Sequence, residues 1–325
     1  MTHLTYLEAA VVGLVQGVSE MFPVSSLGHS VLIPAIIGGS WARDLNVATA
    51  ESPYLAFIVG LHVATAIALI IYFWRDWVRI IGGFFSSIRD RQVDTADQKM
   101  AWMIILATIP VGIAGLAFEH AFRVIFGKPV IAGIFLAVNG LILLAGERYR
   151  TRASLAADAA IAEAREPAEL VGGPRHSAGG SSQRQREQAG TIQADRRLAS
   201  MSYPQAVTVG AAQILALLAG ISRDGVTIVA GMARGLSRED AARFAFLLAT
   251  PVILAAGALK IPDLAGPLGA GIHGQILLGS AASGIGAYLS VRFLLRYLRT
   301  RTLTPFGVYC LIAGLASVAY LGLVK

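Results

Sequence analysis

A short polar stretch near the start of this apolar chain carries an acid, a serine pair and a histidine. Gln16 and Glu20 share one face of a helix, and Ser25, Ser26 and His29 follow closely. A helix beginning at the serines would place His29 near either hydroxyl. Serine and imidazole can act as nucleophiles, and imidazole or carboxylate can carry the proton. The stretch therefore predicts nucleophilic or acid–base chemistry, with Glu20 as proton carrier or cation ligand.

A second polar stretch contains Ser222, Arg223, Asp224 and Thr227. Arg223 ends a long uncharged run, and an arginine there is costly in a bilayer unless it faces a polar cavity or a partner. Its guanidinium can bind two phosphate oxygens. A helix starting at Gly225 would add N-terminal amides that attract the same anion. Structural pairing of Arg223 with Asp224 or with Glu20 is the alternative.

These stretches occupy the same place in two copies of one segment. Shifting residues 6–30 by 197 positions lays them on residues 203–227. The matched pairs include Tyr6 with Tyr203, Gly13 with Gly210, Gln16 with Gln213, Ser25 with Ser222 and Gly28 with Gly225. Pro23 in the first copy and Gly220 in the second predict a helix break just before the serine. Interrupted apolar segments at matching positions predict a site between repeats near the bilayer midplane.

The composition predicts an all-α integral membrane protein. The chain has 325 residues, of which 55% are hydrophobic and 14% charged, with a mean hydropathy of +0.63. Apolar runs predict six transmembrane helices, three after each copy of the repeated segment, each of roughly 20 residues. They cover residues 53–74, 101–118, 129–146, 244–259, 264–291 and 302–324. With two re-entrant helical hairpins, an odd number of spans per half gives an inverted-topology repeat.

The basic residues predict the orientation. The loops 75–100, 147–202, 234–243 and 292–301 fall on one side and hold 21 of the 27 Lys and Arg residues, which places that side in the cytoplasm. The net charge of +7 therefore reflects membrane orientation, and no nucleic-acid partner is expected. The N-terminus lacks the basic region of a cleaved signal, so we expect it to be part of the mature structure.

Three units are expected: a first repeat over 1–146, a flexible cytoplasmic linker over 147–202 and a second, inverted repeat over 203–325. The linker is rich in Ala, Arg, Gln, Ser and Gly, and binding of anionic lipid headgroups is its alternative role. No metal motif is present, although Glu20 could share a divalent cation, Mg or Ca, with a phosphate-bearing substrate. His62 is given at most a supporting role, and a homodimer stays an open alternative.

At these residues the chain resembles the bacterial undecaprenyl pyrophosphate phosphatase family associated with bacitracin resistance. The first family signature, E/QxxxE followed by PxSSxxH, matches Gln16, Glu20, Pro23, Ser25, Ser26 and His29. The second, PGxSRSxxT, matches Gly220, Ser222, Arg223 and Thr227. The run ARFAFLLATP over residues 242–251 also resembles the family's segment after the second signature.

The resemblance implies hydrolysis of undecaprenyl pyrophosphate, an isoprenoid lipid, at a site facing the extracytoplasmic side of the bacterial plasma membrane. It implies Glu20, Ser26, His29 and Arg223 as catalytic residues. Gln16, Ser25, Ser222, Gly225 and Thr227 are expected to line the site. Either Ser26, with His29 as its base, or His29 itself would attack phosphorus.

The chain departs from the family pattern in three ways. Ala219 replaces a proline, Asp224 replaces a serine, and the linker is long. Asp224 would either weaken the attraction of Arg223 for pyrophosphate or turn outward and cap the following helix. A polyprenyl-phosphate lipid transporter or flippase is the alternative function, because inverted repeats with broken helices are also a transporter architecture.

Overall fold

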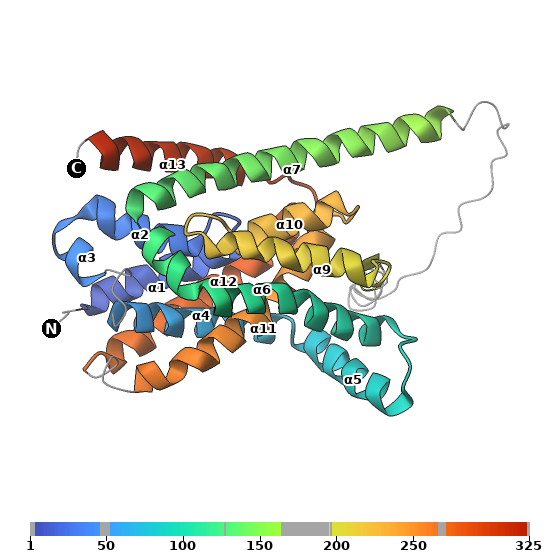
Figure 1. The fold of residues 1–325 in the computed structure, drawn as a ribbon, viewed down its shortest axis with the longest axis horizontal. Helices are drawn as coiled ribbons and strands as arrows, with labels where there is room; N and C mark the ends of the chain where they lie inside the picture. Colours follow the sequence, from blue (N-terminus) through green and yellow to red (C-terminus); the bar gives the residue numbers. More distant parts are fainter. Residues whose placement is uncertain are drawn as a thin grey trace, which may run out of the picture.

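The computed structural model describes residues 4–45, 53–126, 128–163, 195, 197–265 and 271–323, and these contain helices but no strand. The helices are α1 (Tyr6–Met21), α2 (Ser26–Ile37), α3 (Gly39–Asp44), α4 (Pro53–Tyr72), α5 (Trp74–Asp90), α6 (Ala96–Phe126), α7 (Pro129–Glu163), α9 (Tyr203–Ala211), the 3₁₀ helix η1 (Ala212–Leu217), α10 (Arg223–Ala233), α11 (Arg238–Ala265), α12 (His273–Leu298) and α13 (Thr304–Leu323). Figure 1 shows most of them running along the long axis of the molecule.

The expected multi-pass, all-α membrane protein is confirmed. Parts of α6, α7, α11, α12 and α13 are long and apolar enough to cross a bilayer, and the bent pair of α4 and α5 gives the sixth candidate. One expected span is displaced. The run 264–291 was predicted as one helix, but α11 ends at Ala265 and α12 begins at His273. Just before α12, Gly271 has φ +81°, outside the helical range, so α12 does not extend back through it.

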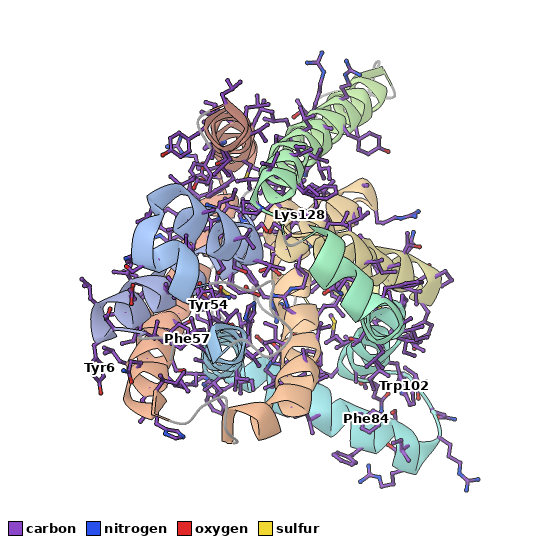
Figure 2. All side chains as sticks on the ribbon, turned by 60° about the vertical axis from the view of Figure 1, so that its left-hand side comes forward. Tyr6, Tyr54, Phe57, Phe84, Trp102 and Lys128 are labelled. Atoms are coloured by element: carbon purple, nitrogen blue, oxygen red, sulfur yellow. The ribbon has the colours of Figure 1, made fainter. Side chains whose placement is uncertain are left out.

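The expected loop 75–100 is largely helical, which corrects the sequence-based prediction. It contains α5 and the start of α6, and α5 is bent by 84° from residues 57–72 of α4. Trp102 of α6 donates to Ser87 of α5 over 3.0 Å, and its ring lies 5.5 Å from that of Phe84 (Figure 2). At Gly83 a Cβ would lie 2.7 Å from the backbone of Asp97, so glycine allows close approach.

Both predicted helix breaks are confirmed, and the two copies share their capping pattern. α1 ends at Met21 and α2 begins at Ser26, whereas η1 ends at Leu217 and α10 begins at Arg223. Thr5 and Ser202, which are 197 positions apart, each form a capping box at the start of α1 and α9. Ser25 accepts from the amide of Gly28, and Ser222 accepts from that of Gly225.

The matched glycines of the two copies also make matched contacts. Gly13 of α1 packs on Gly279 of α12, and Gly210 of α9 packs on Ala107 of α6, with no space for a Cβ at either glycine. α7 packs along α13. Figure 1 shows the start of α1, the end of α13 and α3 at one end of the molecule, with α5 and the far end of α7 at the other.

Near α5, ion pairs connect α11 with α5 and with residues 195 and 197. Arg243, in the run 242–251, lies 2.8 Å from both Asp76 of α5 and Asp195. Arg197 donates two hydrogen bonds to Asp240. Part of the expected linker is helical, because α7 continues to Glu163. The remainder over 164–194 lies outside the described residues, and the division into three units stays a prediction.

Candidate functional site

The two helix breaks touch. A Cβ built on Gly28 would lie 3.0 Å from the Cα of Gly220, and one built on Gly225 would lie 3.3 Å from the Cβ of Pro23. Gly220 has φ +112°, and a Cβ there would lie 2.4 Å from the carbonyl oxygen of Ala132. Only glycine therefore fits at this position. Contact between the breaks brings the N-termini of α2 and α10 together.

Asn139 of α7 links both breaks, and the sequence analysis missed it. Its Nδ2 donates to the carbonyl of Pro23 over 2.9 Å, and its Oδ1 accepts from the amide of Ser222 over 3.0 Å. The residue is fully buried. An amide alone in the apolar run 129–146 was the available signal, because a buried polar group in a span needs partners.

Glu20 is the centre of the site. Its Oε1 accepts from Nη2 of Arg223 over 2.7 Å, and its Oε2 accepts from the hydroxyl of Ser26 and, over 2.9 Å, from Nε2 of Gln16. Glu20, Ser26 and Gln16 are buried. The structure therefore brings together Gln16, Glu20, Ser26 and Arg223, which were expected to share a site.

His62 of α4 also contacts Glu20, and the sequence analysis undervalued it. Its Nε2 lies 3.3 Å from Oε2 of Glu20 and 3.1 Å from Nε2 of Gln16. Its Nδ1 donates to the carbonyl of Ile58 over 2.9 Å. In the neutral ring Nε2 is then the unprotonated nitrogen, so a proton held by Glu20 has an acceptor next to it.

Asp224 turns inward, which corrects one of its expected placements. It is 1% exposed, and its Oδ1 accepts from Nε of Arg223 over 3.4 Å. The cap of α10 is Ser222, because the helix begins at Arg223 rather than at Gly225. Among the described residues, the amides of Arg223 and Asp224 have no acceptor, so this helix end can still bind an anion.

His29 bonds to the backbone of Ser25 and to Tyr309. Its Nδ1 donates to the carbonyl of Ser25 over 2.7 Å, and its Nε2 lies 2.7 Å from the hydroxyl of Tyr309, whose ring stacks on the imidazole. No hydrogen bond within the described part of the chain joins His29 to the hydroxyl of Ser25 or Ser26. The imidazole bonds instead to the carbonyl four residues earlier, which also accepts from the amide of His29 over 3.2 Å. Tyr309 comes from a distant helix, and nothing in the sequence pointed to it.

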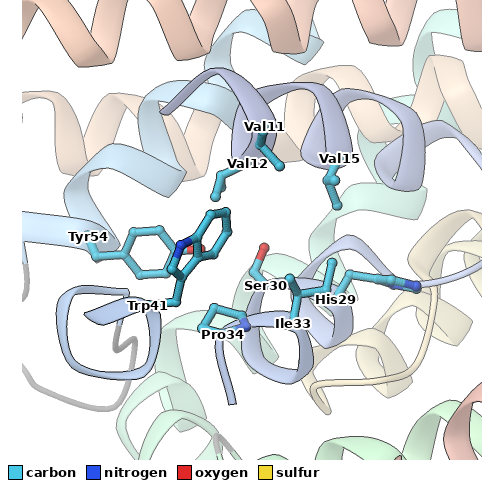
Figure 3. A pocket seen from close by; sticks show the side chains of 9 residues that line it. All are labelled: Val11, Val12, Val15, His29, Ser30, Ile33, Pro34, Trp41 and Tyr54. Carbon is cyan, nitrogen blue, oxygen red and sulfur yellow. The ribbon is translucent and has the colours of Figure 1, made fainter. Parts of the chain in front are cut away.

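His29 also borders a small apolar pocket between α1 and α2. Val11, Val12 and Val15 line one side, and Figure 3 shows the imidazole pointing out of the pocket. Its volume is about 10 Å³, enough for about one water molecule. An isoprenoid chain does not fit inside it.

The hydroxyls of Ser25, Ser222 and Thr227 serve the backbone. Those of Ser25 and Ser222 cap α2 and α10, and that of Thr227 donates to the carbonyl of Arg223 over 2.7 Å. Gly225 lies at the contact between the breaks. These residues therefore shape the site that they were expected to line.

The described residues fit a protein-held divalent cation poorly. None of them form a group of three or more His, Cys, Asp or Glu side chains arranged around a metal. Both oxygens of Glu20 already accept hydrogen bonds from Arg223, Ser26 and Gln16. A cation would have to displace them, since hard cations need free oxygen ligands.

Comparisons with known proteins identify the family of the chain. The chain is 59% identical over 321 residues to the undecaprenyl-diphosphatase of Mycolicibacterium paratuberculosis, covering 99% of both chains. It is 54% identical to undecaprenyl-diphosphatase 2 of Frankia alni, with 97% of both covered. It is 38% identical to undecaprenyl-diphosphatase 2 of Chromobacterium violaceum, with 97% and 98% covered. The model of the bacitracin resistance protein BacA family matches residues 9–316, and the chain belongs to that family.

Proposed function

We propose that this membrane protein hydrolyses undecaprenyl pyrophosphate to undecaprenyl phosphate and inorganic phosphate, which recycles the lipid carrier of cell-wall synthesis. The observation that carries the proposal is the cluster of Glu20, Ser26 and Arg223 at the contact of two helix N-termini. Relatives named undecaprenyl-diphosphatase over nearly the whole chain support the substrate.

Arg223 and the start of α10 hold the pyrophosphate. The guanidinium donates to Glu20 and Asp224, and among the described residues its Nη1 has no acceptor, so donors remain for phosphate oxygens. The amides of Arg223 and Asp224 add partial positive charge. Phosphoryl transfer depends mainly on positioning and charge stabilisation, which this arrangement supplies.

Ser26 is the nucleophile that this geometry favours. Its hydroxyl already donates to Glu20, so the proton passes to that carboxylate as Oγ bonds to the terminal phosphorus. The bond from that phosphorus to the bridging oxygen breaks, and undecaprenyl phosphate leaves with the electron pair. Water then hydrolyses the phosphoserine. His29, whose Nε2 is the unprotonated nitrogen, is the base for that water.

The proposed topology keeps the inverted repeat and places the site on the extracytoplasmic side. Matching helix contacts between the two halves support the repeat. α1 of the first half packs on α12 of the second, and α9 of the second half packs on α6 of the first. The charge asymmetry of the loops supports the orientation. The isoprenoid tail lies in the bilayer beside the helices, because the pocket next to His29 is too small for it.

The test is phosphate release from undecaprenyl pyrophosphate by the purified protein in detergent, with and without a chelator. A transporter would release none, because detergent abolishes transport. We expect Ser26→Ala and Arg223→Ala to lose more than about 100-fold in kcat. Ser317→Ala, which removes a buried hydroxyl in α13, is the matched control and stays active.

Acid-stable phosphoserine trapped during turnover would support Ser26, whereas acid-labile phosphohistidine would assign the attack to His29. Absence of release by folded wild-type protein would overturn the function.

A further inference from the structure

α5 carries an apolar stripe that no described helix covers. Trp74, Val78, Ile81, Phe85 and Ile88 are 55%, 62%, 50%, 65% and 53% exposed. At 100° per residue these five side chains fall within a sector of about 80° on the helix surface. A stripe this narrow and continuous indicates a contact surface rather than scattered exposed residues.

The stripe is distinct from the face that packs α5 onto the protein. Ile80, Gly83 and Ser87 are the buried positions of α5. The last two lie against α6, through the close approach at Gly83 and the hydrogen bond from Trp102. On the helix surface these positions lie over a quarter turn from the centre of the stripe. The stripe is therefore free for a second partner while α5 remains packed on α6.

The direction of α5 indicates that partner. α4 has 20 residues without a charged side chain, long enough for the roughly 30 Å hydrocarbon core. α5 turns away from residues 57–72 by 84°, so it runs nearly parallel to the membrane plane. It also carries Arg75, Asp76, Arg79, Arg89 and Asp90, which exclude it from the core.

The charges on α5 favour an anionic surface. Arg79 is neutralised by Asp76 and Asp195. Arg75 lies over the ring of Trp74, with 5.4 Å to its centroid, and within the described chain no carboxylate pairs with Arg75 or Arg91. Arginine and tryptophan are typical of the headgroup region of a membrane.

We propose that α5 is an amphipathic helix that lies in the surface of the membrane. Its stripe inserts at the boundary between headgroups and acyl chains, and Arg75 and Arg91 bind the phosphates of anionic phospholipids. The helix thereby fixes the depth and tilt of the neighbouring spans α4 and α6. This role is separate from the hydrolytic site and does not depend on it.

The first test measures the depth of two labelled positions in lipid nanodiscs. Phe85→Cys lies in the stripe, and Asp90→Cys, an exposed polar position at the end of α5, is the matched control; the native Cys310 is buried. A nitroxide at residue 85 is expected to be more accessible to oxygen, which dissolves in the bilayer, than to a water-soluble nickel chelate. The label at residue 90 is expected to show the reverse.

The second test addresses the lipid. In nanodiscs of phosphatidylcholine and phosphatidylglycerol, the double variant Arg75→Gln/Arg91→Gln is expected to retain less than half as much phosphatidylglycerol per protein as wild type. The paired residue Arg89→Gln is the control. Unchanged retention, or a water-exposed label at residue 85, would overturn the proposal. Dipolar broadening between labels at residue 85 would overturn it too, because a second copy of the chain would then cover the stripe.

Discussion

The two carboxylate oxygens of Glu20 contact different groups. Oε1 holds Arg223, whereas Oε2 accepts from Ser26 and lies beside Nε2 of His62. A carboxylate that takes the serine proton becomes neutral and loses part of its attraction for Arg223. In the proposed mechanism, transfer of that proton to His62 would restore the negative charge of Glu20.

Replacing His62 tests this relay. His62→Gln retains a side chain that can hydrogen-bond to Glu20 but cannot carry a proton at neutral pH. We expect kcat to fall about 10- to 100-fold with an unchanged KM, and the acidic limb of the pH–rate profile to change. His273→Gln at the exposed start of α12 is the control. An unaltered pH profile would give His62 a purely structural role.

Tyr309 orients the imidazole of His29. Its hydroxyl faces Nε2 while the carbonyl of Ser25 holds the Nδ1 proton. Tyr309→Phe keeps the ring and removes this hydrogen bond, so we expect kcat to fall about 3- to 10-fold with little change in KM. The Nδ1–H tautomer should persist, because Ser25 still accepts that proton, and the ¹⁵N shift of Nε2 should move to that of a nitrogen without a hydrogen bond. Tyr320→Phe, on the exposed surface of the same helix, should change neither quantity.

Residue types were predicted better than residue contacts. The sequence predicted Glu20, Ser26 and Arg223 as site residues, because polar side chains in apolar segments are costly unless they have a binding partner. His62, Asn139 and Tyr309 were undervalued or missed. Each reaches the site from a separate helix, and sequence spacing carries no information on such distant contacts. The placement of His29 in the site stays a prediction; its bonds are to the carbonyl of Ser25 and to Tyr309.

At the level of elements, the breaks were predictable and their junction was not. Pro23 and Gly220 predict the helix breaks, because proline and glycine disfavour a continuing helix. Asn139 bridges the two breaks through contacts between residues that are distant in the sequence, so the spacing of residues could not predict its role. α5 was mistaken for a loop because of its charges, although the spacing of its apolar residues was already that of an amphipathic helix.

Gly220 tests the junction. Gly220→Ala would place a Cβ 2.4 Å from the carbonyl oxygen of Ala132 at φ +112°, so the loop that carries Ser222 and Arg223 must move. We expect a loss of about 2–4 kcal/mol in stability and a marked loss of activity. Gly235→Ala has φ +89° and open space, and should cost only about 1 kcal/mol. Equal shifts in thermal midpoint for both variants would contradict the steric argument.

At the level of the whole molecule, the two ends differ in charge and in bonding. The end that contains α5 and the far end of α7 carries the ion pairs of Arg243, Arg197 and Arg299. The opposite end, with α3 and the end of α13, has few basic residues in the sequence (Figure 1). The distribution of Lys and Arg among the loops predicted this difference in charge, because successive loops lie at opposite ends of the molecule.

Orientation in the cell membrane is the remaining prediction. Ser40→Cys in α3 and Thr300→Cys after α12 are both exposed, at opposite ends of the molecule, and the native Cys310 is buried. An impermeant thiol reagent should label residue 40 in intact cells and residue 300 only after the membrane is opened, because basic loops stay in the cytoplasm. The reverse pattern would place α5 on the outer surface. The charge argument would then fail, and the orientation proposed for the active site would fail with it.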